Sequence, residues 1–385
     1  MIALTAAELL TPVDRVEEPI LMLDGALIAD VRSRRASEIP SGCRVIDFGD
    51  GVLAPGFVDI HIHGGGGRDV MEPAPDALAT IGQLIARHGV SAYLPTTVTA
   101  PMDDTLRSLE YLAGAIERGV AHDGNVAARP RGIHLEGPFI SHARRGVHPP
   151  ANLLPPTVAA FDRFWQAARG HIRMMTIAPE LSGALEVIAE ATRRGVCVSL
   201  GHSDADLETT RAAVKSGARH STHTFNAMRP LGHRDPGIVG AVLTDSRISA
   251  DIIADGIHLH PTIVKLFLQM KGDAQSVLIT DATSATGMPE GKYRLGGLDI
   301  EVKDGKCLAD GKLAGSVLTM DRAIQNAIAF GDWSLPHAVR AATLNPAMVA
   351  RLDHSGTVRP GSSADLVVLG PKGEVRNTII AGRGL

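Results

Sequence analysis

The chain has 385 residues, of which 44% are hydrophobic and 21% charged, with a formal net charge of −4 at pH 7. This length exceeds one small domain and suits a large α/β domain with an accessory piece. The acidic balance excludes a basic surface for a nucleic-acid backbone. The N-terminal residues lack a basic segment followed by an apolar core, and no apolar run approaches the ~20 residues that span a bilayer. Three separated cysteines (Cys43, Cys197, Cys307) fit a reducing compartment, so we expect a cytoplasmic protein.

Short strands with glycine turns open the chain, at residues 20–31 and 44–53, and the same pattern returns at 356–371 and 375–383. These pieces flank a long central region. We therefore expect residues 1–53 and 355–385 to pair with each other in one small β-domain.

The central region, residues 54–354, alternates strand and helix patterns. Helical apolar spacing marks residues 75–89, 105–119 and 184–195, and a glycine ends each pattern. Eight strand-like runs accompany such helices, at 57–63, 91–97, 131–137, 173–180, 195–203, 218–226, 248–258 and 275–283. Eight β–α alternations within about 300 residues predict a (β/α)₈ barrel, whose active site lies at the C-terminal ends of its strands.

Metal-binding residue types gather at those strand ends. His61 and His63 close the first strand, and residues two apart in a strand point to the same face. Both imidazoles can therefore bind one cation. The alternative, a solvated histidine pair, is disfavoured by the Pro-Gly turn before the pair and the run of four glycines after it.

Glu136 ends the third strand, His202 the fifth and His223 the sixth. One carboxylate and two imidazoles are the three protein ligands typical of a catalytic zinc site, with one position left for water. Asp281 ends the eighth strand, where a carboxylate beside an acidified water can accept its proton and deliver it to a leaving amine. A hydrogen-bonded structural aspartate is the alternative for Asp281.

The remaining histidines are expected to be structural. We interpret His134 as a packed interior residue, with a minor chance of ligation, and His220 as too early in its strand to reach the rim. Surface or structural roles are expected for five others: His88, His122, His171, His337 and His354.

The strand-end pattern resembles the amidohydrolase superfamily. The motifs APGFVDIHIHG, HLEGPF, RGVHPP, GHSDA, THTFNAM, IIADGIH, TDATSATG and AGSVLTMDRA narrow the resemblance to its N-acetylglucosamine-6-phosphate deacetylases. AATLNPA and GSSADLVVL extend it over nearly the whole chain. The resemblance implies a barrel with a β-sandwich built from both chain ends, and hydrolysis of the acetamide of N-acetylglucosamine 6-phosphate.

The same resemblance implies residue roles. Glu136, His202 and His223 match the main metal ligands, and His61 and His63 match ligands of a second metal that some members lack. Asp281 matches the catalytic acid/base, which can also bind metal. His148 matches the residue that hydrogen-bonds the acetyl carbonyl. The further residues that match substrate contacts are Val147, Asn226, Ala227, Arg234, His258, Leu313, Ala314 and Gly315.

The resemblance also implies a homodimer in which Arg234 or His258 serves the neighbouring site. One or two divalent metals per subunit are expected; zinc is favoured, and the same ligands suit iron or manganese. Arg234 follows the sixth strand, and arginine matches the oxygens of a phosphate, which independently supports a phosphosugar.

Two rival functions are less consistent with the sequence. Cyclic-amide and nucleobase hydrolases often carry a carboxylated lysine on the fourth strand, but RMMTIAPE has no lysine there. A catalytically inactive barrel serving in assembly or regulation would lose metal ligands first, and the full set is present. Both points favour the deacetylase.

Overall fold

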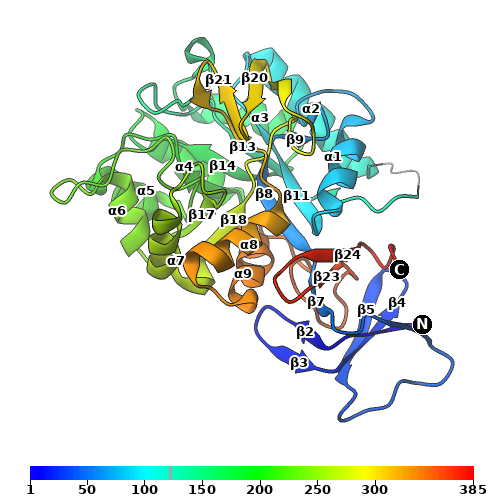
Figure 1. Ribbon diagram of the computed structural model, residues 1–385. Helices are drawn as coiled ribbons and strands as arrows, with labels where there is room; N and C mark the ends of the chain where they lie inside the picture. Colours follow the sequence, from blue (N-terminus) through cyan, green and yellow to red (C-terminus); the bar gives the residue numbers. More distant parts are fainter. Residues whose placement is uncertain (121–123) are drawn as a thin grey trace.

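The computed structural model describes residues 1–120 and 124–385. The chain folds as a barrel of parallel strands surrounded by helices, with two further sheets from the chain ends packed beside it (Figure 1). The predicted (β/α)₈ barrel and the accessory β-sandwich are both confirmed. Their limits at residues 54 and 354 stay a prediction.

All eight predicted barrel strands are present. Each pairs in parallel with its neighbours in the ring, from β8 through β11 to β18, and β12 (Arg129–Pro130) lies beside β11. An isolated parallel bridge from Ile62, at the end of the first strand, to Ala282, just after the last strand, nearly closes the ring. The strands are β8 (Phe57–Ile62), β11 (Val90–Thr97), β13 (Ile133–Glu136), β14 (Ile172–Ile177), β15 (Cys197–Leu200), β16 (His220–Ser221), β17 (Ser249–Ile253) and β18 (Ser276–Ile279).

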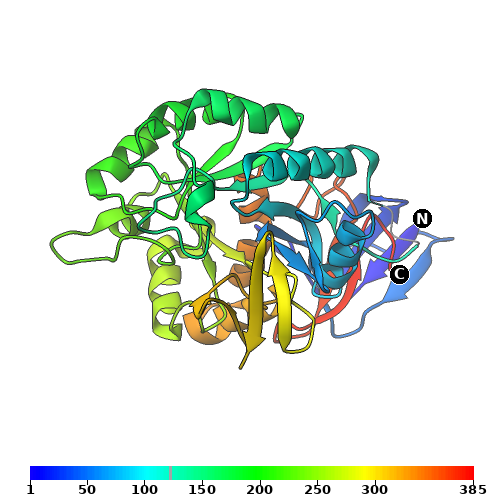
Figure 2. The same cartoon turned by 90° about the horizontal axis from the view of Figure 1, so that it is seen from above.

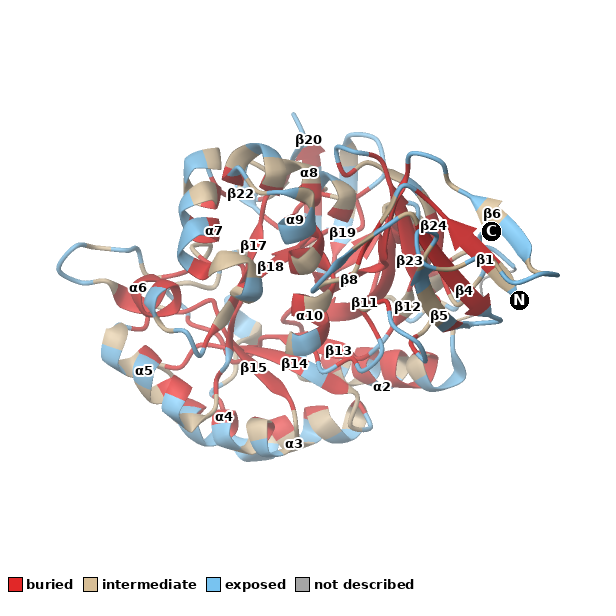
Figure 3. Ribbon diagram, turned by 90° about the horizontal axis from the view of Figure 1, so that it is seen from below, coloured by how far each residue is buried: buried red, intermediate tan, exposed pale blue. Residues whose placement is uncertain are grey.

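Helices cover the outside of the barrel, and their outer faces are exposed while the strands are buried (Figures 2 and 3). Strands covered on both faces are buried along their whole length, as in β8 and β11. The helices are α1 (Ala77–Ala86), α2 (Met102–Arg118), α3 (Val158–Ala167), α4 (Ala184–Arg193), α5 (Leu207–Ser216), α6 (Gly237–Thr244), α7 (Pro261–Gln275), α8 (Met320–Gly331), α9 (Leu335–Ala342) and α10 (Leu344–Val349), with a 3₁₀ turn η1 (Pro150–Asn152). Among the described residues, none of these helices combines the length and apolarity that crossing a membrane requires.

The two chain ends meet in a sandwich of two sheets. One sheet has the order β5-β4-β1-β6 and the other β24-β23-β7-β2-β3. The second sheet joins the ends directly, because β23 runs antiparallel to β7 with Val368 opposite Leu53. Leu4, Leu9 and Leu366 pack between the sheets. The strands are β1 (Ile2–Thr5), β2 (Glu8–Leu10), β3 (Arg15–Glu17), β4 (Pro19–Asp24), β5 (Leu27–Ser33), β6 (Arg44–Asp47), β7 (Val52–Pro55), β23 (Leu366–Leu369) and β24 (Val375–Ile379).

A small antiparallel sheet that the sequence did not predict follows the eighth barrel strand. It contains β19 (Gly291–Leu295), β20 (Leu298–Lys303), β21 (Lys306–Ala309) and β22 (Lys312–Leu313). Leu295 and Ile300 pack against Val98 from the loop after β11. A hydrogen bond anchors the turn between β19 and β20, because Asp69 accepts the Gly296 N–H at 2.7 Å. Asp69 belongs to a short two-stranded ribbon of β9 (Gly64–Gly65) and β10 (Arg68–Asp69). The sheet therefore returns the chain, after β22, to the ends of the barrel strands.

Candidate active site

Six predicted residues converge at the C-terminal ends of the barrel strands. Each is at most 6% exposed, although all carry ionisable side chains. They are His61, His63, Glu136, His202, His223 and Asp281. Buried ionisable groups are costly unless they pair with each other or bind metal, so this concentration marks the site.

The six side chains form two groups that share Glu136. In the first group, His63 Nε2 lies 3.2 Å from His61 Nε2 and 3.1 Å from Asp281 Oδ1. In the second, His223 Nε2 lies 3.1 Å from both His202 Nε2 and Glu136 Oε1. Glu136 also reaches the first group, since its Oε1 lies 3.4 Å from His61 Nε2 and its Oε2 3.4 Å from His63 Nε2. A carboxylate in this position can bridge two cations.

Backbone carbonyls fix the tautomers of two of these histidines. His63 Nδ1 lies 2.9 Å from the carbonyl oxygen of Thr96, and His202 Nδ1 lies 3.0 Å from that of Arg144. Because a carbonyl oxygen only accepts, each Nδ1 must carry the hydrogen. The Nε2 lone pairs of His63 and His202 therefore point into the site, as metal ligation requires.

His148 has the opposite tautomer. Its Nδ1 accepts the Thr99 backbone N–H at 3.3 Å, and the Thr99 hydroxyl lies 2.8 Å from the same nitrogen. The neutral ring must then carry its hydrogen on Nε2, which faces Glu136 Oε2 at 3.7 Å. Burial lowers the pKa of His148 to about 3, with help from the charge of His202, so the ring stays neutral. His148 is thus built to donate a hydrogen bond, although it lies close enough to Glu136 and His202 to be grouped with them as a ligand.

Three cluster residues adopt backbone conformations that non-glycine residues rarely occupy. His202, His223 and Asp281 have φ values of +47°, +27° and +50°. Such conformations cost roughly 1–3 kcal/mol each and persist where the surroundings enforce them. Gly315 lies against this bend: a Cβ on it would come within 2.8 Å of the Asp281 carbonyl oxygen. Only glycine allows the two segments to approach this closely.

The electrostatics of the cluster keep its carboxylates ionised. Burial opposes ionisation of Glu136, yet the imidazoles of His61, His202 and His223 hold its pKa well below the usual range. Burial likewise opposes ionisation of Asp281, while His61 and His63 lower its pKa to about 2. In return, and against the effect of burial, Glu136 raises the pKa of His223 to about 9. The cluster thus brings ionised carboxylates and imidazole nitrogens together in the two groups of side chains described above.

The donor set fits two divalent cations. Two nitrogens bound to one tetrahedral zinc ion at about 2.0–2.1 Å lie roughly 3.3 Å apart. The ring nitrogens of His61 and His63 are separated by 3.2 Å, and those of His202 and His223 by 3.1 Å. Two inward lone pairs at this distance repel unless a cation or a proton lies between them. The spacing of these ring nitrogens thus fits the binding of divalent metal.

A cavity of about 200 Å³ opens onto the cluster, and most of the predicted substrate contacts line it. His258 is among them, and its Nδ1 lies 2.7 Å from Asp255 Oδ2. The cavity-lining residues on the predicted list are His63, Glu136, Val147, His148, His202, His223, Asn226, Ala227, His258, Asp281, Leu313, Ala314 and Gly315. Arg234 does not line this cavity; it is exposed on the loop before α6.

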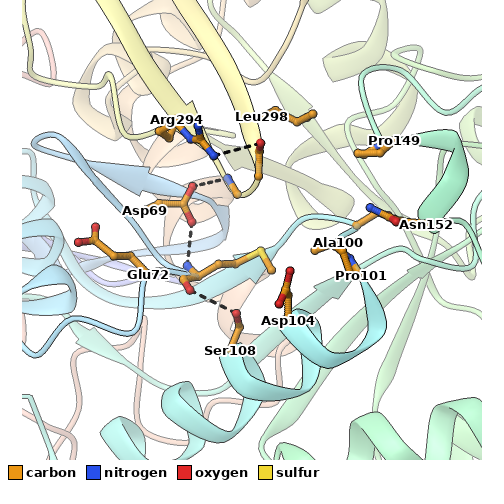
Figure 4. A pocket seen from close by; sticks show the side chains of 14 residues that line it. Asp69, Glu72, Ala100, Pro101, Asp104, Ser108, Pro149, Asn152, Arg294 and Leu298 are labelled. Carbon is orange, nitrogen blue, oxygen red and sulfur yellow. Dashed lines mark hydrogen bonds between the residues drawn. The ribbon is translucent and has the colours of Figure 1, made fainter.

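A larger cavity of about 610 Å³ lies beside this one, between the β19–β20 turn and the start of α2 (Figure 4). The two share a wall, because Thr99 and Pro149 line the larger cavity while their neighbours Val98 and His148 line the smaller. At its edge, Asp69 accepts the backbone N–H groups of Met71 and Gly296, and the Ser108 hydroxyl donates to the Met71 carbonyl. None of the six cluster residues lines the larger cavity, so the chemistry belongs to the smaller one.

Two other interior histidines have internal partners for both ring nitrogens. His134 bonds the Ile60 carbonyl and the Thr176 hydroxyl, and His220 bonds Ser249 and Asp251. Nearer the surface, His88 Nδ1 lies 3.1 Å from a carboxylate oxygen of Asp321, and His171 Nε2 lies 3.3 Å from one of Glu117. His122 lies outside the described residues. The expectation that these described histidines are structural agrees with their contacts.

Sequence reasoning missed three residues that support the cluster. Thr99 orients His148, as shown above. Asp59 accepts the His61 N–H at 3.2 Å, and Asp251 accepts the His223 N–H. A usable signal existed only for Asp59, which precedes His61 by two residues in the same strand and so faces the same side.

Comparison with known proteins agrees with this geometry. Residues 52–385 match the Amidohydrolase family. The chain is 38% identical to the N-acetylgalactosamine-6-phosphate deacetylase of Escherichia coli O157:H7, over 86% of this chain and 87% of the relative. It is 37% identical to the N-acetylglucosamine-6-phosphate deacetylase of Lysinibacillus sphaericus, over 86% and 84% of the two chains.

Solved structures give the same picture. A mutant N-acetyl-D-glucosamine-6-phosphate deacetylase from Mycobacterium smegmatis, in complex with N-acetyl-D-glucosamine-6-phosphate, superposes with a TM-score of 0.92. That match has 36% identity and covers 100% of this chain and 98% of the other. The N-acetylglucosamine-6-phosphate deacetylase from Thermotoga maritima matches with a TM-score of 0.87 and 31% identity, over 98% of both chains. Sequence, fold and site geometry thus agree, and the chain belongs to the amidohydrolase family.

Proposed function

We propose that this protein hydrolyses the acetamide of N-acetylglucosamine 6-phosphate to glucosamine 6-phosphate and acetate. The observation that carries the proposal is the pair of histidine–carboxylate groups that both contact Glu136 beside one cavity. Relatives bearing the names of such deacetylases, at 36–39% identity over most of the chain, supply the substrate class.

We propose His61, His63, Glu136, His202, His223 and Asp281 as the residues that hold one or two divalent ions. Zinc suits a set of imidazoles and carboxylates, and iron and manganese accept the same ligands. When bound, such an ion polarises an amide carbonyl and acidifies water. The two-group geometry supports room for two ions, with Glu136 common to both.

Asp281 has the chemistry of a general base and then a general acid. Its pKa near 2 keeps it ionised at neutral pH, so it can accept a proton from the attacking water. The same carboxyl can then deliver that proton to the nitrogen of the leaving amine. His148, with its hydrogen on Nε2, can donate to the acetyl carbonyl oxygen as negative charge develops there.

Sugar and phosphate contacts are assigned to the cavity wall. We propose that Val147, Asn226, Ala227, His258 and the Leu313–Gly315 segment contact the substrate. Their common cavity supports this assignment.

Arg234 would bind the phosphate, and its place on an exposed loop outside the cavity favours service to a second subunit. We therefore propose a homodimer that completes each site with the partner's Arg234. The free thiols of Cys43, Cys197 and Cys307 fit the cytoplasm as the place of action.

An acetate-release assay tests the function. N-acetylglucosamine 6-phosphate is compared with its dephosphorylated form and with N-acetylgalactosamine 6-phosphate, because a relative bearing the latter name is similarly close. We expect the phosphorylated glucosamine derivative to give the highest kcat/KM. Equal rates with and without phosphate, or preference for the galacto epimer, would contradict the substrate assignment.

A further inference from the structure

We propose that Asp251 is a positioning residue for the second metal group, the one built on His202 and His223, with His220 holding Asp251 from behind. The inference rests on the proposed metal site and deepens it. Asp251 lies in the middle of β17, is fully buried, and does not itself touch the cavity.

The need for such a residue arises from the shortness of β16. This strand pairs with β17 at only two positions, His220 with Ser249 and Ser221 with Ala250. The regular ladder therefore stops before His223. The His223 backbone, at φ +27°, is in a conformation that must be enforced from outside.

Asp251 supplies the missing hydrogen bonds. Its Oδ1 accepts the His223 N–H, and its backbone carbonyl accepts the Thr224 N–H at 2.9 Å. Among the described residues, the His223 ring finds no partner for its Nδ1. Apart from the Nε2 contacts inside the metal group, the orientation of this ring thus depends on its backbone, which Asp251 holds. The other cluster histidines with known tautomers, His63 and His202, are oriented through their rings instead.

His220 completes the arrangement from the opposite side of the carboxylate. Its Nε2 lies 2.9 Å from Asp251 Oδ2, and its Nδ1 lies 2.7 Å from Ser249 Oγ. Because His220 and His223 belong to the same short segment, one carboxylate ties both ends of that segment to β17. A charge-assisted bond to a buried ring keeps Asp251 from turning away from His223.

The first group has a similar contact, since Asp59 accepts the His61 N–H at 3.2 Å, but its backbone is also held by regular pairing. His61 receives a hydrogen bond at its carbonyl from the Asp281 N–H at 2.9 Å, so backbone pairing continues up to the ligand itself. Loss of Asp251 should therefore weaken one metal group and spare the other. This asymmetry separates a positioning role from general destabilisation.

The test uses full-length protein loaded with zinc and a competing chromophoric chelator, which reports each ion's affinity without any turnover. For Asp251→Ala we expect one of two zinc ions to bind about 10–100-fold more weakly while the other keeps its wild-type affinity. Asp251→Asn keeps an acceptor oxygen for the His223 N–H and should lose less. His220→Gln should shift the same ion in the same direction.

Asn345→Ala provides the matched control, since Asn345 is also buried and hydrogen-bonded but contacts the start of β18, at the opposite end of the strands from the ligands. Wild-type affinity at both sites in folded Asp251→Ala, or equal weakening of both ions, would overturn the inference. If Asp251→Ala does not fold, the same two outcomes in Asp251→Asn and His220→Gln decide it. A wild-type protein that binds no zinc would instead contradict the metal proposal itself.

Discussion

The two ends of the barrel handle buried polar groups in opposite ways. At the C-terminal end, ring nitrogens of His61, His63, His202 and His223 face one another across 3.1–3.2 Å. At the N-terminal end, buried polar groups are satisfied by backbone carbonyls. Asn345 Nδ2 donates to the carbonyls of Asp273 and Ser276 at 2.6 and 2.8 Å, and Lys271 Nζ to that of Val242 at 2.9 Å.

The difference separates function from stability within one ring of strands. Donors and acceptors that satisfy each other add to the free energy of unfolding. Imidazoles and carboxylates crowded together in a buried site lower it and are suited to binding a metal ion. Substitutions at the C-terminal end should therefore alter metal binding and turnover, while those at the N-terminal end should alter stability alone.

The largest expected effect is on turnover. Asp281→Asn should lower kcat by about 10²–10⁴-fold, because the amide cannot accept the water's proton. Steady-state kinetics and metal analysis of the same preparation check this, and the second metal group should keep its ion. Retention of more than about a tenth of the wild-type kcat would exclude Asp281 as the base.

The second-largest effect is expected on the number of metal ions bound per chain. The His61→Asn/His63→Asn double variant should fall from two bound zinc ions per chain to one, since the first group loses both imidazoles. Elemental analysis after zinc saturation and removal of the excess measures this. One ion in both proteins, with equal activity, would mean that the two histidines only hydrogen-bond within the site.

A smaller effect is expected at the exposed loop. Arg234→Ala should raise KM for the phosphorylated sugar about ten- to a hundredfold, the worth of one charge-assisted contact. The dephosphorylated sugar serves as the control and should be nearly unaffected. Equal losses on both substrates would place the phosphate contact elsewhere.

At the N-terminal end, Asn345→Ala should lower the free energy of unfolding by roughly 1–3 kcal/mol, because buried carbonyls lose their donor. Denaturant titration of the zinc-loaded protein measures it. Its kcat/KM should match that of the wild type at temperatures where both are folded. A large kinetic defect would break the proposed division between the two ends.

The smallest effect concerns pH. Burial lowers the pKa of Lys271 from 10.5 to about 8 in the folded protein. Between these values the unfolded chain binds a proton that the folded chain does not, so the free energy of unfolding should rise with pH. Lys271→Met should lack this rise. Denaturant titrations of both proteins at pH 8 and pH 10 give the comparison, and parallel behaviour would refute it.

The sequence predicted the barrel well because its strands end in recognisable residues. His61, Glu136 and Asp281 each follow an apolar run, and strand ends of a closed parallel sheet must meet. The sheet of β19–β22 was missed because its strands are short and none of them ends in a metal-binding residue, although β20 alternates exposed and buried residues regularly.

Contacts between residues that lie far apart in the chain cannot be predicted from one sequence. Asp251 looks like any strand residue until β16 is seen to end after two residues. Thr99 and His148 are 49 residues apart, and nothing local indicates that the backbone of one sets the tautomer of the other. Arg234 illustrates a further limit, because a rim position inferred from chain order corresponds to an exposed loop outside the cavity.

The pairing of β7 with β23 has a consequence for biosynthesis. Leu53 and its partner Val368 are separated by about 300 residues of barrel, which at about 5–20 residues per second emerge over roughly 15–60 s. During that interval the edge of β7 lacks its neighbour β23, and the sandwich core lacks Leu366, Val368 and Ile379. The first segment made is thus among the last to be completed, and a nascent chain stalled before β23 exposes an adhesive sheet edge.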